Sequence, residues 1–238
     1  MQSIKCEYPP GLVGVMSGDL SRFTDFTCSM IQLAVPSGSS WFWVRGNGFA
    51  RNANLIVQHM LDYAEHKLQW VFIMGDDHVF EQDIIMRLLA HNVDIVQPLV
   101  STRKPPFFPY AFKWAQEKGM FDVLDWDELP RQGLFRVDGT SSAGMLVKRK
   151  VVETIKAPWF EEGKFISDAL GEDLWFAKKA MEAGFRSYLD LDTLMGHITT
   201  AGVWPTMQDD KWCIDLDMLH GLRIRVDSKI GRNIIKEQ

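Results

Sequence analysis

The sequence has few of the features that mark disulfide-rich, zinc-binding or membrane-spanning proteins. Its three cysteines, Cys6, Cys28 and Cys213, lie far apart and form no CxxC pair, so we expect free thiols in a reducing compartment. No apolar run approaches the ~18 residues of a membrane span, and residues 1–10 lack the basic start and apolar stretch of a signal peptide. We therefore predict a cytoplasmic protein.

Motifs of several enzyme classes are missing as well. The chain has no GxGxxG fingerprint, no Walker phosphate loop, no GxSxG elbow and no HExxH pair. These absences argue against a dehydrogenase, a kinase, a serine hydrolase and a zinc protease. Acidic residues outnumber basic ones by 31 to 26, and the net charge of −5 does not favour nucleic acid as a partner, although a local basic cleft stays open.

What the chain does contain is enough apolar and aromatic residues for a packed core. Its 238 residues are 46% hydrophobic and include 15 Phe and 9 Trp, which excludes a disordered or collagen-like chain. Strand-like runs at 12–16, 41–44, 70–74 and 93–96 alternate with helical spacing at 23–33, 52–66 and 84–89. This alternation predicts an α/β fold with a central, mostly parallel sheet flanked by helices.

The second half of the chain is less regular. Prolines break residues 98–140, which we expect to form a long shaped loop. A strand at 143–147, a helix at 172–183 closed by Gly184 and a strand at 185–189 follow, and the last thirty-five residues are mixed. No linker separates these parts, so we predict one domain over residues 1–238.

The sharpest chemical feature is the run Gly75-Asp76-Asp77-His78 after the apolar strand at 70–74. Ligands of open α/β sheets gather at the carboxyl ends of the strands. Alternation along an extended segment would let Asp76 and His78 reach one ion while Asp77 faces a neighbouring group. Oxygen and imidazole ligands suit Mn²⁺ or a similar divalent ion. The simpler alternative is that Asp77 caps the next helix and His78 is merely exposed.

A second group of polar residues lies about a hundred residues later. Glu172 and Asp173 begin the helix at 172–183, where acids ordinarily interact with the helix dipole. His197 follows a strand and taken alone is an ordinary loop histidine. Together with Asp76 and His78 it becomes a third ligand that leaves positions open for substrate oxygens.

Several residues are candidates for holding a phosphate or a nucleotide. The basic ones lie near predicted strand or helix ends, and each has solvation as its simpler alternative. They are Arg51, Arg103, Lys104 and Arg136. The turn Gly14-Val15-Met16-Ser17-Gly18-Asp19 after the first strand is similar to a nucleotide-contacting turn.

Taken in order, these segments resemble the GT-A-fold nucleotide-sugar glycosyltransferases of the family 2-like type over about residues 12–205. WVFIMGDDHVF resembles the strand that leads to the family's DxD metal motif, and Ala50-Arg51-Asn52 its frequent Arg-Asn at an early helix. GMLVKR resembles the acceptor-side strand, GEDLWFAKKAMEAGF the ED helix, and LDTLMGHI the strand end with a metal-binding histidine.

The resemblance implies transfer of a sugar from a nucleoside diphosphate, a UDP-sugar first, to an acceptor hydroxyl with Mn²⁺ or Mg²⁺. Asp76, His78 and His197 would bind the metal, and Asp77 would replace Asp76 in a register where Gly75 takes the place of the first Asp. Asp173, and next Glu172, would be the general base. The resemblance extends donor binding to Ser17, Asp19, Arg51, Asn52, Asp76 and Arg103. Residues 12–97 would form the nucleotide-sugar half, 98–205 the acceptor half and 206–238 a tail.

The stereochemistry and the acceptor stay open. The Asp-x-His set also resembles retaining transferases that place N-acetylgalactosamine on polypeptides, whereas the ED pair resembles inverting ones, and we favour inversion. Residues 101–110, Trp204, Trp212 and His220 would shape the acceptor site for a glycan, lipid-linked, protein or small-molecule acceptor. Two alternatives are a sugar nucleotidyltransferase and a noncatalytic carbohydrate-binding module. The first usually has a basic, glycine-rich loop that residues 13–22 lack.

Overall fold

The computed structural model describes residues 8–18, 23–63, 68–103, 106–164, 171–208, 211–218 and 222–227. The chain divides into two compact units, a larger one of Met1–Ser101 and Phe108–His197 and a smaller one of Thr102–Phe107 and Ile198–Gln238. The sequence-based expectation of a single domain, with inner boundaries near residues 97 and 205, remains a prediction. Cys6, Asp19, Lys104 and His220, which the sequence-based expectations name, lie outside the described residues.

The elements of the larger unit follow one another along the chain. They are β1 (Leu12–Ser17), α1 (Thr24–Gln32), β2 (Ser40–Arg45), α2 (Phe49–Asp62), β3 (Trp70–Gly75), β4 (His78–Phe80), α3 (Ile84–Ala90), β5 (Ile95–Leu99), β6 (Phe112–Ala115), β7 (Met120–Val123), the 3₁₀ turn η1 (Trp126–Glu128), β8 (Leu134–Val137), β9 (Met145–Lys148), α4 (Arg149–Thr154), α5 (Glu172–Glu182) and β10 (Ser187–His197). The smaller unit contains β11 (Ala201–Gln208), β12 (Lys211–Met218) and β13 (Leu222–Asp227).

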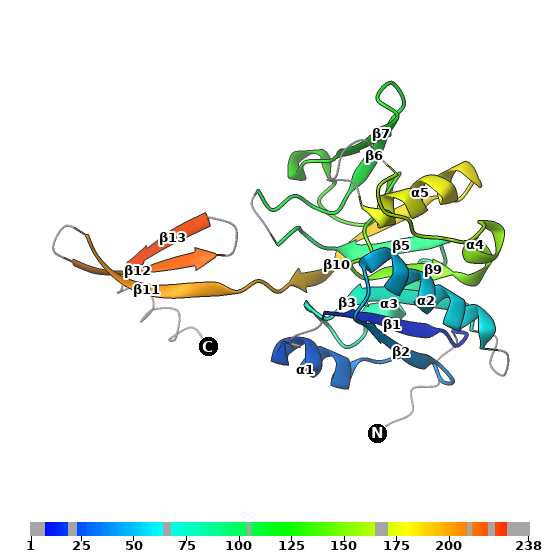
Figure 1. Ribbon diagram of the computed structural model, residues 1–238, viewed down its shortest axis with the longest axis horizontal. Helices are drawn as coiled ribbons and strands as arrows, with labels where there is room; N and C mark the ends of the chain where they lie inside the picture. Colours follow the sequence, from blue (N-terminus) through cyan, green and yellow to red (C-terminus); the bar gives the residue numbers. More distant parts are fainter. Residues whose placement is uncertain are drawn as a thin grey trace. The chain divides into compact units, whose positions relative to one another are not determined.

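The central sheet of the larger unit runs in the order β2-β1-β3-β9-β5-β10-β4, and β8 also pairs with β10. β1 is parallel to β2 and β3, and β5 is parallel to β10. β9 lies between β3 and β5 and is antiparallel to both, so β1, β2, β3, β5 and β10 all point the same way. Figure 1 shows these strands side by side, with β2 at one edge. The predicted mostly parallel sheet between helices is confirmed, with three reversed strands: β9 near its centre, and β4 and β8, which are both antiparallel to β10.

Helix α2 lies close to β1 because a glycine makes room for it. Ile56, Val57 and Met60 on the inner side of α2 are 0% exposed. A Cβ at Gly14 of β1 would lie 2.3 Å from Ile56 Cγ2, so a larger residue there would push the helix away from the sheet. The recurrence of apolar residues every three or four positions in α2 therefore forms a buried face, as the sequence predicted.

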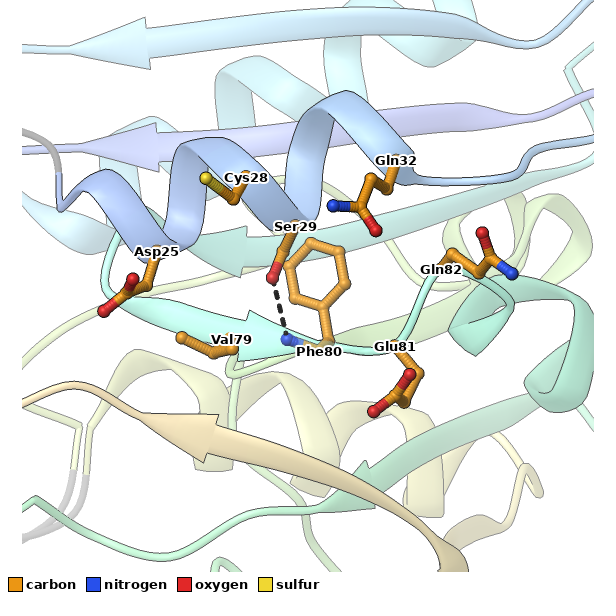
Figure 2. A pocket seen from close by; sticks show the side chains of 8 residues that line it. All are labelled: Asp25, Cys28, Ser29, Gln32, Val79, Phe80, Glu81 and Gln82. Atoms are coloured by element: carbon orange, nitrogen blue, oxygen red, sulfur yellow. Dashed lines mark hydrogen bonds between the residues drawn. The ribbon is translucent and has the colours of Figure 1, made fainter. Parts of the chain in front are cut away.

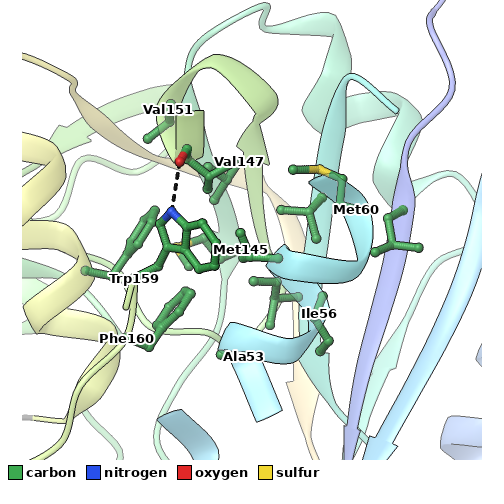
Figure 3. Packing of buried hydrophobic residues seen from close by; sticks show 14 of the residues in the cluster. Ala53, Ile56, Met60, Met145, Val147, Val151, Trp159 and Phe160 are labelled. Carbon is green, nitrogen blue, oxygen red and sulfur yellow. Dashed lines mark hydrogen bonds between the residues drawn. The ribbon is translucent and has the colours of Figure 1, made fainter. Parts of the chain in front are cut away.

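The hydrophobic cluster that contains Ile56, Val57 and Met60 joins elements that are distant in sequence. Figure 3 shows Ile56 and Met60 of α2 near Met145 of β9, with Trp159 and Phe160 on the other side of the cluster. Trp159 Nε1 donates a 2.8 Å hydrogen bond to the carbonyl of Val152, so the buried indole is satisfied. Packing from α2, α4 and α5 thus holds one face of the sheet.

Strand β3 is covered on both of its faces. The five residues from Trp70 to Met74 are at most 1% exposed. Side chains of a strand alternate between the two faces, so both sides of the sheet are covered at β3. Such burial explains the continuous apolar run WVFIM, and it places the polar residues that follow at the carboxyl edge of the sheet.

Residues 98–140 are more regular than the sequence suggested. β6 and β7 form a hairpin with Phe112 opposite Val123, and β8 joins β10 in the central sheet. Pro109 precedes β6 and Pro130 lies between η1 and β8, so the three four-residue strands form between and after these prolines. Strands this short show too little alternation for the sequence to reveal them.

The later helix agrees with its prediction. The expected helix over 172–183 is α5, and Gly184 directly after it has φ of +90°. That left-handed conformation suits glycine and ends the helix. The mixed tail contains an antiparallel sheet, in which β12 pairs with both β11 and β13.

Two further expectations concern the cysteines and the membrane. Cys28 and Cys213 are free thiols, and Cys6 lies outside the described residues. Within the part of the chain that the structure describes, no helix combines the length and the apolar character needed to cross a bilayer.

Candidate functional site

Two strands bring together polar residues that are 120 positions apart in sequence. β3 ends at Gly75, and a turn of two residues, Asp76 and Asp77, leads into β4 at His78. β4 pairs antiparallel with the end of β10, where His78 stands directly opposite His197. The carboxyl edge of the sheet therefore receives both histidines and the two acids, as the sequence predicted for an α/β ligand site.

Asp77 lies between the two imidazoles. Its Oδ1 is 3.2 Å from His78 Nδ1, and its Oδ2 is 3.2 Å from His197 Nε2. The two rings stack with their centroids 4.6 Å apart and their planes 21° apart. One ligand atom from each of the three residues lies within 4.8 Å of the others, so the group is compact enough to hold one metal ion.

The hydrogen bonds of His197 indicate that a proton or a cation lies between its ring and Asp77. His197 Nδ1 lies 3.0 Å from the carbonyl oxygen of Ser101, which can only accept, so Nδ1 carries a proton. In a neutral ring, Nε2 then presents a lone pair to the Asp77 carboxylate 3.2 Å away. Two acceptors at that distance require a proton or a cation between them. A metal-binding histidine fixed by a backbone carbonyl shows this same pattern.

His78 is held in a similar way. Its Nδ1 lies 3.3 Å from the carbonyl oxygen of Gly75 as well as close to Asp77, and its side chain is buried. Gly75 itself leaves space for this turn, because a Cβ there would lie 2.7 Å from Asp77 Oδ1. Gly75 is thus small for a steric reason.

Asp76 lies beside Ser17 at the end of β1. The pKa of Asp76 is raised, mainly by burial and further by the charge of Asp77. Hydrogen bonds from the Ser17 hydroxyl and the Gly18 backbone, at the end of β1, partly oppose this rise. Asp76 is therefore half-buried beside β1 and is not one of the three residues in the compact group. Ser17 Oγ is buried without a hydrogen bond of normal geometry to any described residue.

Glu172 and Asp173 form a pair of acids with perturbed pKa values at the start of α5. Burial raises the pKa of Glu172 to about 7, helped by the charge of Asp173, and burial raises that of Asp173 to about 6. Asp173 accepts hydrogen bonds from the backbone N–H groups of Leu174 at 2.8 Å and Ser142 at 3.3 Å. A carboxylate with a pKa near neutrality is suited to accept a proton in catalysis.

The bond to Ser142 ties Asp173 to the carboxyl edge of the sheet. Ser142 lies just before β9, whose first residue Met145 pairs with Ile73 near the end of β3. Gly144 N also donates a 3.0 Å hydrogen bond to the Ile73 carbonyl. The acids of α5 and the acids after β3 thus approach the same edge of one sheet.

Of the remaining residues predicted to bind the donor or a phosphate, Asn52 is buried and the arginines are exposed. Asn52 is 3% exposed, its Nδ2 donates to the Asn47 carbonyl at 3.2 Å, and its Oδ1 has no hydrogen-bonding partner among the described residues. Arg51 is exposed on α2 and Arg136 is exposed on β8. Arg103 is exposed in the smaller unit.

A pocket with no signal in the sequence lies between α1 and β4. Its volume is about 430 Å³, and it begins at Val79, the residue after His78. Figure 2 shows Asp25 and Cys28 of α1 on one side and Glu81 on the other, with the Phe80 backbone N–H bonded to Ser29 Oγ. This bond fixes β4 against α1 and so fixes the strand that carries His78.

Comparison with known proteins supports the fold and leaves the activity to be argued. No family model and no curated protein matches the sequence. The crystal structure of A197 from STIV is similar with a TM-score of 0.52 and 15% identity, covering 90% of this chain and 97% of that one. The structure of GalNAc-T7 with UDP, GalNAc and Mn²⁺ is similar with a TM-score of 0.52 and 12% identity, covering 81% of this chain and 44% of that one. This chain thus spans less than half of GalNAc-T7, and at these identities the likeness shows that its fold is GT-A-like.

Proposed function

We propose that the protein is a metal-dependent glycosyltransferase that moves a sugar from a nucleoside diphosphate to an acceptor hydroxyl. The observation that carries the proposal is the Asp77 carboxylate between His78 and His197 at the carboxyl edge of a GT-A-like sheet. One carboxylate and two imidazoles suit Mn²⁺ or a similar borderline ion. The neighbour GalNAc-T7, whose structure holds UDP and Mn²⁺, supports the same class of donor.

In this proposal Asp77, His78 and His197 hold the metal, and Asp76 lies beside the donor at the end of β1. A divalent ion supplies positive charge that stabilises the diphosphate as it leaves. His197 is oriented for this task by the Ser101 carbonyl, which keeps its proton on Nδ1 and turns Nε2 towards the ion. The sequence resemblance named Asp76 as the first carboxylate ligand and Asp77 as the alternative, and this proposal exchanges the two.

A buried polar atom suits a contact with the nucleoside part of a donor. Asn52 Oδ1 is buried and has no hydrogen-bonding partner among the described residues, while the buried Ser17 hydroxyl lies beside Asp76. A buried acceptor without a partner costs stability, so a ligand donor or a water is expected there. We extend donor binding to Arg51, Asp19 and Arg103 as the resemblance implies, with UDP-sugars first among the donors.

Asp173 is the proposed general base, with Glu172 next. The acceptor hydroxyl would pass its proton to the Asp173 carboxylate while its oxygen forms a bond to the anomeric carbon and the bond from that carbon to the diphosphate breaks. Backbone N–H groups of Leu174 and Ser142 hold the carboxylate in one orientation. Direct attack of this kind inverts the anomeric centre, and a retained product would exclude it.

The proposal is tested by thermal-shift measurements with UDP, GDP, CDP and dTDP, each with and without Mn²⁺. Linkage requires that a nucleotide bound through the metal raise the melting temperature only when both are present. His197→Ala should remove the metal-dependent shift. His59→Ala, which changes a half-buried histidine on α2 away from this group, is the matched control and should keep it. No shift with any nucleotide in the wild type would contradict the proposal.

A further inference from the structure

The sheet of the smaller unit has one apolar face and one polar face. Its register places Val203 opposite Leu216, and Leu216 opposite Ile224, so these three side chains share a face. Pro205 stands opposite Ile214 two positions further along and continues it. The described members of this apolar face are Ala201, Val203, Pro205, Met207, Ile214, Leu216 and Ile224.

The opposite face carries charges that are paired within the sheet. Trp204 stands opposite Asp215, and Asp215 stands opposite Arg225. Arg225 donates from Nε at 2.7 Å and from Nη2 at 2.9 Å to the two carboxylate oxygens of Asp215. This fork-shaped pair satisfies the buried carboxylate without a second molecule.

In this sheet apolar side chains are exposed to solvent, whereas a charged side chain is buried. Val203 is 65% exposed and Met207 52%, whereas the carboxylate residue Asp215 is 3% exposed. No described position on the apolar face carries a charge. A small sheet needs its apolar face covered to be stable, and an exposed apolar face of this extent marks an interaction surface.

We infer that the apolar face of β11–β13 is covered by the same face of a second copy of this chain, related by a two-fold axis. Strands β11 and β12 have eight residues each. With β13, which has six residues, they make a footprint of roughly 350 Å² per copy measured flat. Two copies give roughly 700 Å², which lies below the ~1,200 Å² lower bound of stable specific interfaces and in the range of weak, transient ones.

The character of the face selects an identical partner. A face without charge offers no charge pattern by which a different protein would be recognised. Two identical faces match each other in extent and in apolar character by symmetry, and two sheets pack face to face at about 10 Å. The modest area predicts a dimer that forms and dissociates with concentration. This inference does not depend on the proposed activity.

Sedimentation velocity of the full chain from about 1 to about 200 µM tests the inference, because a dimer of this size should dissociate in that range. The double variant Val203→Thr with Ile224→Thr replaces methyl groups by hydroxyls and keeps the branched side chains that strands favour. Its dissociation constant should be at least about tenfold higher than that of the wild type. The matched control, Trp204→Thr, changes a residue of the other face that is 59% exposed, and should alter the constant by less than about twofold.

A wild-type monomer at every concentration overturns the inference. Equal weakening by Trp204→Thr and by the double variant overturns it as well. If circular dichroism shows that the double variant is unfolded, Met207→Gln replaces it, since Met207 lies near the end of β11. A folded Met207→Gln variant with an unchanged dissociation constant also overturns it.

Discussion

His78 and His197 stand directly opposite each other on β4 and β10, with their rings stacked 4.6 Å apart and the Asp77 carboxylate in contact with both. The pairing fixes both imidazoles through backbone hydrogen bonds, so neither ring depends on a flexible loop for its position. The proposed metal site would therefore be preorganised.

The first prediction separates the two aspartates. Asp77→Asn should weaken Mn²⁺ binding by at least about tenfold, because it removes the charged ligand from the group formed with both histidines. Asp76→Asn should have a smaller effect on the metal alone, since Asp76 lies beside Ser17. Calorimetric titration with Mn²⁺ in the absence of nucleotide measures both. The opposite order of effects would assign the ligand to Asp76.

The second prediction concerns the base. Asp173→Asn should leave the metal-dependent thermal shift by nucleotide unchanged and lower sugar transfer by about 10²-fold or more, because the amide cannot accept the proton of the acceptor. Glu172→Gln serves as the companion variant and should retain more activity. If Glu172→Gln abolished transfer while Asp173→Asn did not, the roles of the two acids would be exchanged.

The third prediction is a pH dependence of stability. The pKa of Glu172 is raised from 4.5 to about 7 in the folded protein, so its contribution to stability is full below pH 4.5 and is lost as the pH rises through about 7. Glu172→Gln should therefore be more stable than the wild type at pH 8, by on the order of 1 to 3 kcal/mol, and the difference should vanish near pH 4.

Urea denaturation at the two pH values measures this difference. Glu182→Gln is the matched control at the other end of α5, where the side chain is 58% exposed and pairs with Lys178. Exposed pairs contribute little, so this control should show no gain at pH 8. A gain for Glu172→Gln of the same size at both pH values would show that burial of the charge is not its cause.

The fourth prediction tests the contact between α2 and the sheet. Gly14→Ala places a Cβ 2.3 Å from Ile56 Cγ2 and should lower the free energy of unfolding by about 1–3 kcal/mol. Gly18→Ala, where an added Cβ meets no atom within 4 Å, is the control. Equal stability of the two variants in urea denaturation would mean that α2 shifts without cost.

The sequence predicted the sheet better than the details of the site. Apolar runs such as the one from Trp70 to Met74 show buried strands directly, because burial on both faces leaves no room for polar residues. The reversed direction of β9 has no such signal, because strand direction depends on pairing between distant segments. The hairpin of β6 and β7 was missed because four residues are too few to show a period.

At the site, the sequence identified the region and the residue types. It paired Asp76 with His78 by the alternation of an extended strand, but β3 ends at Gly75 and a turn follows, so the alternation does not continue through Asp76 and Asp77. The role of the Ser101 carbonyl in orienting His197 has no sequence signal, since any residue provides a carbonyl.

The separation of Asp77 from His197 by 120 residues also has a consequence for how the protein folds. The group closes only when β10 has docked on β4, which is a contact of high sequence separation, and such contacts are slow to form. A nascent chain cannot complete the group until residue 197 has left the ribosome. Binding of the proposed ion would therefore be coupled to the docking of β10, so metal should slow global unfolding more than it slows local opening of the α1 or β2 edge.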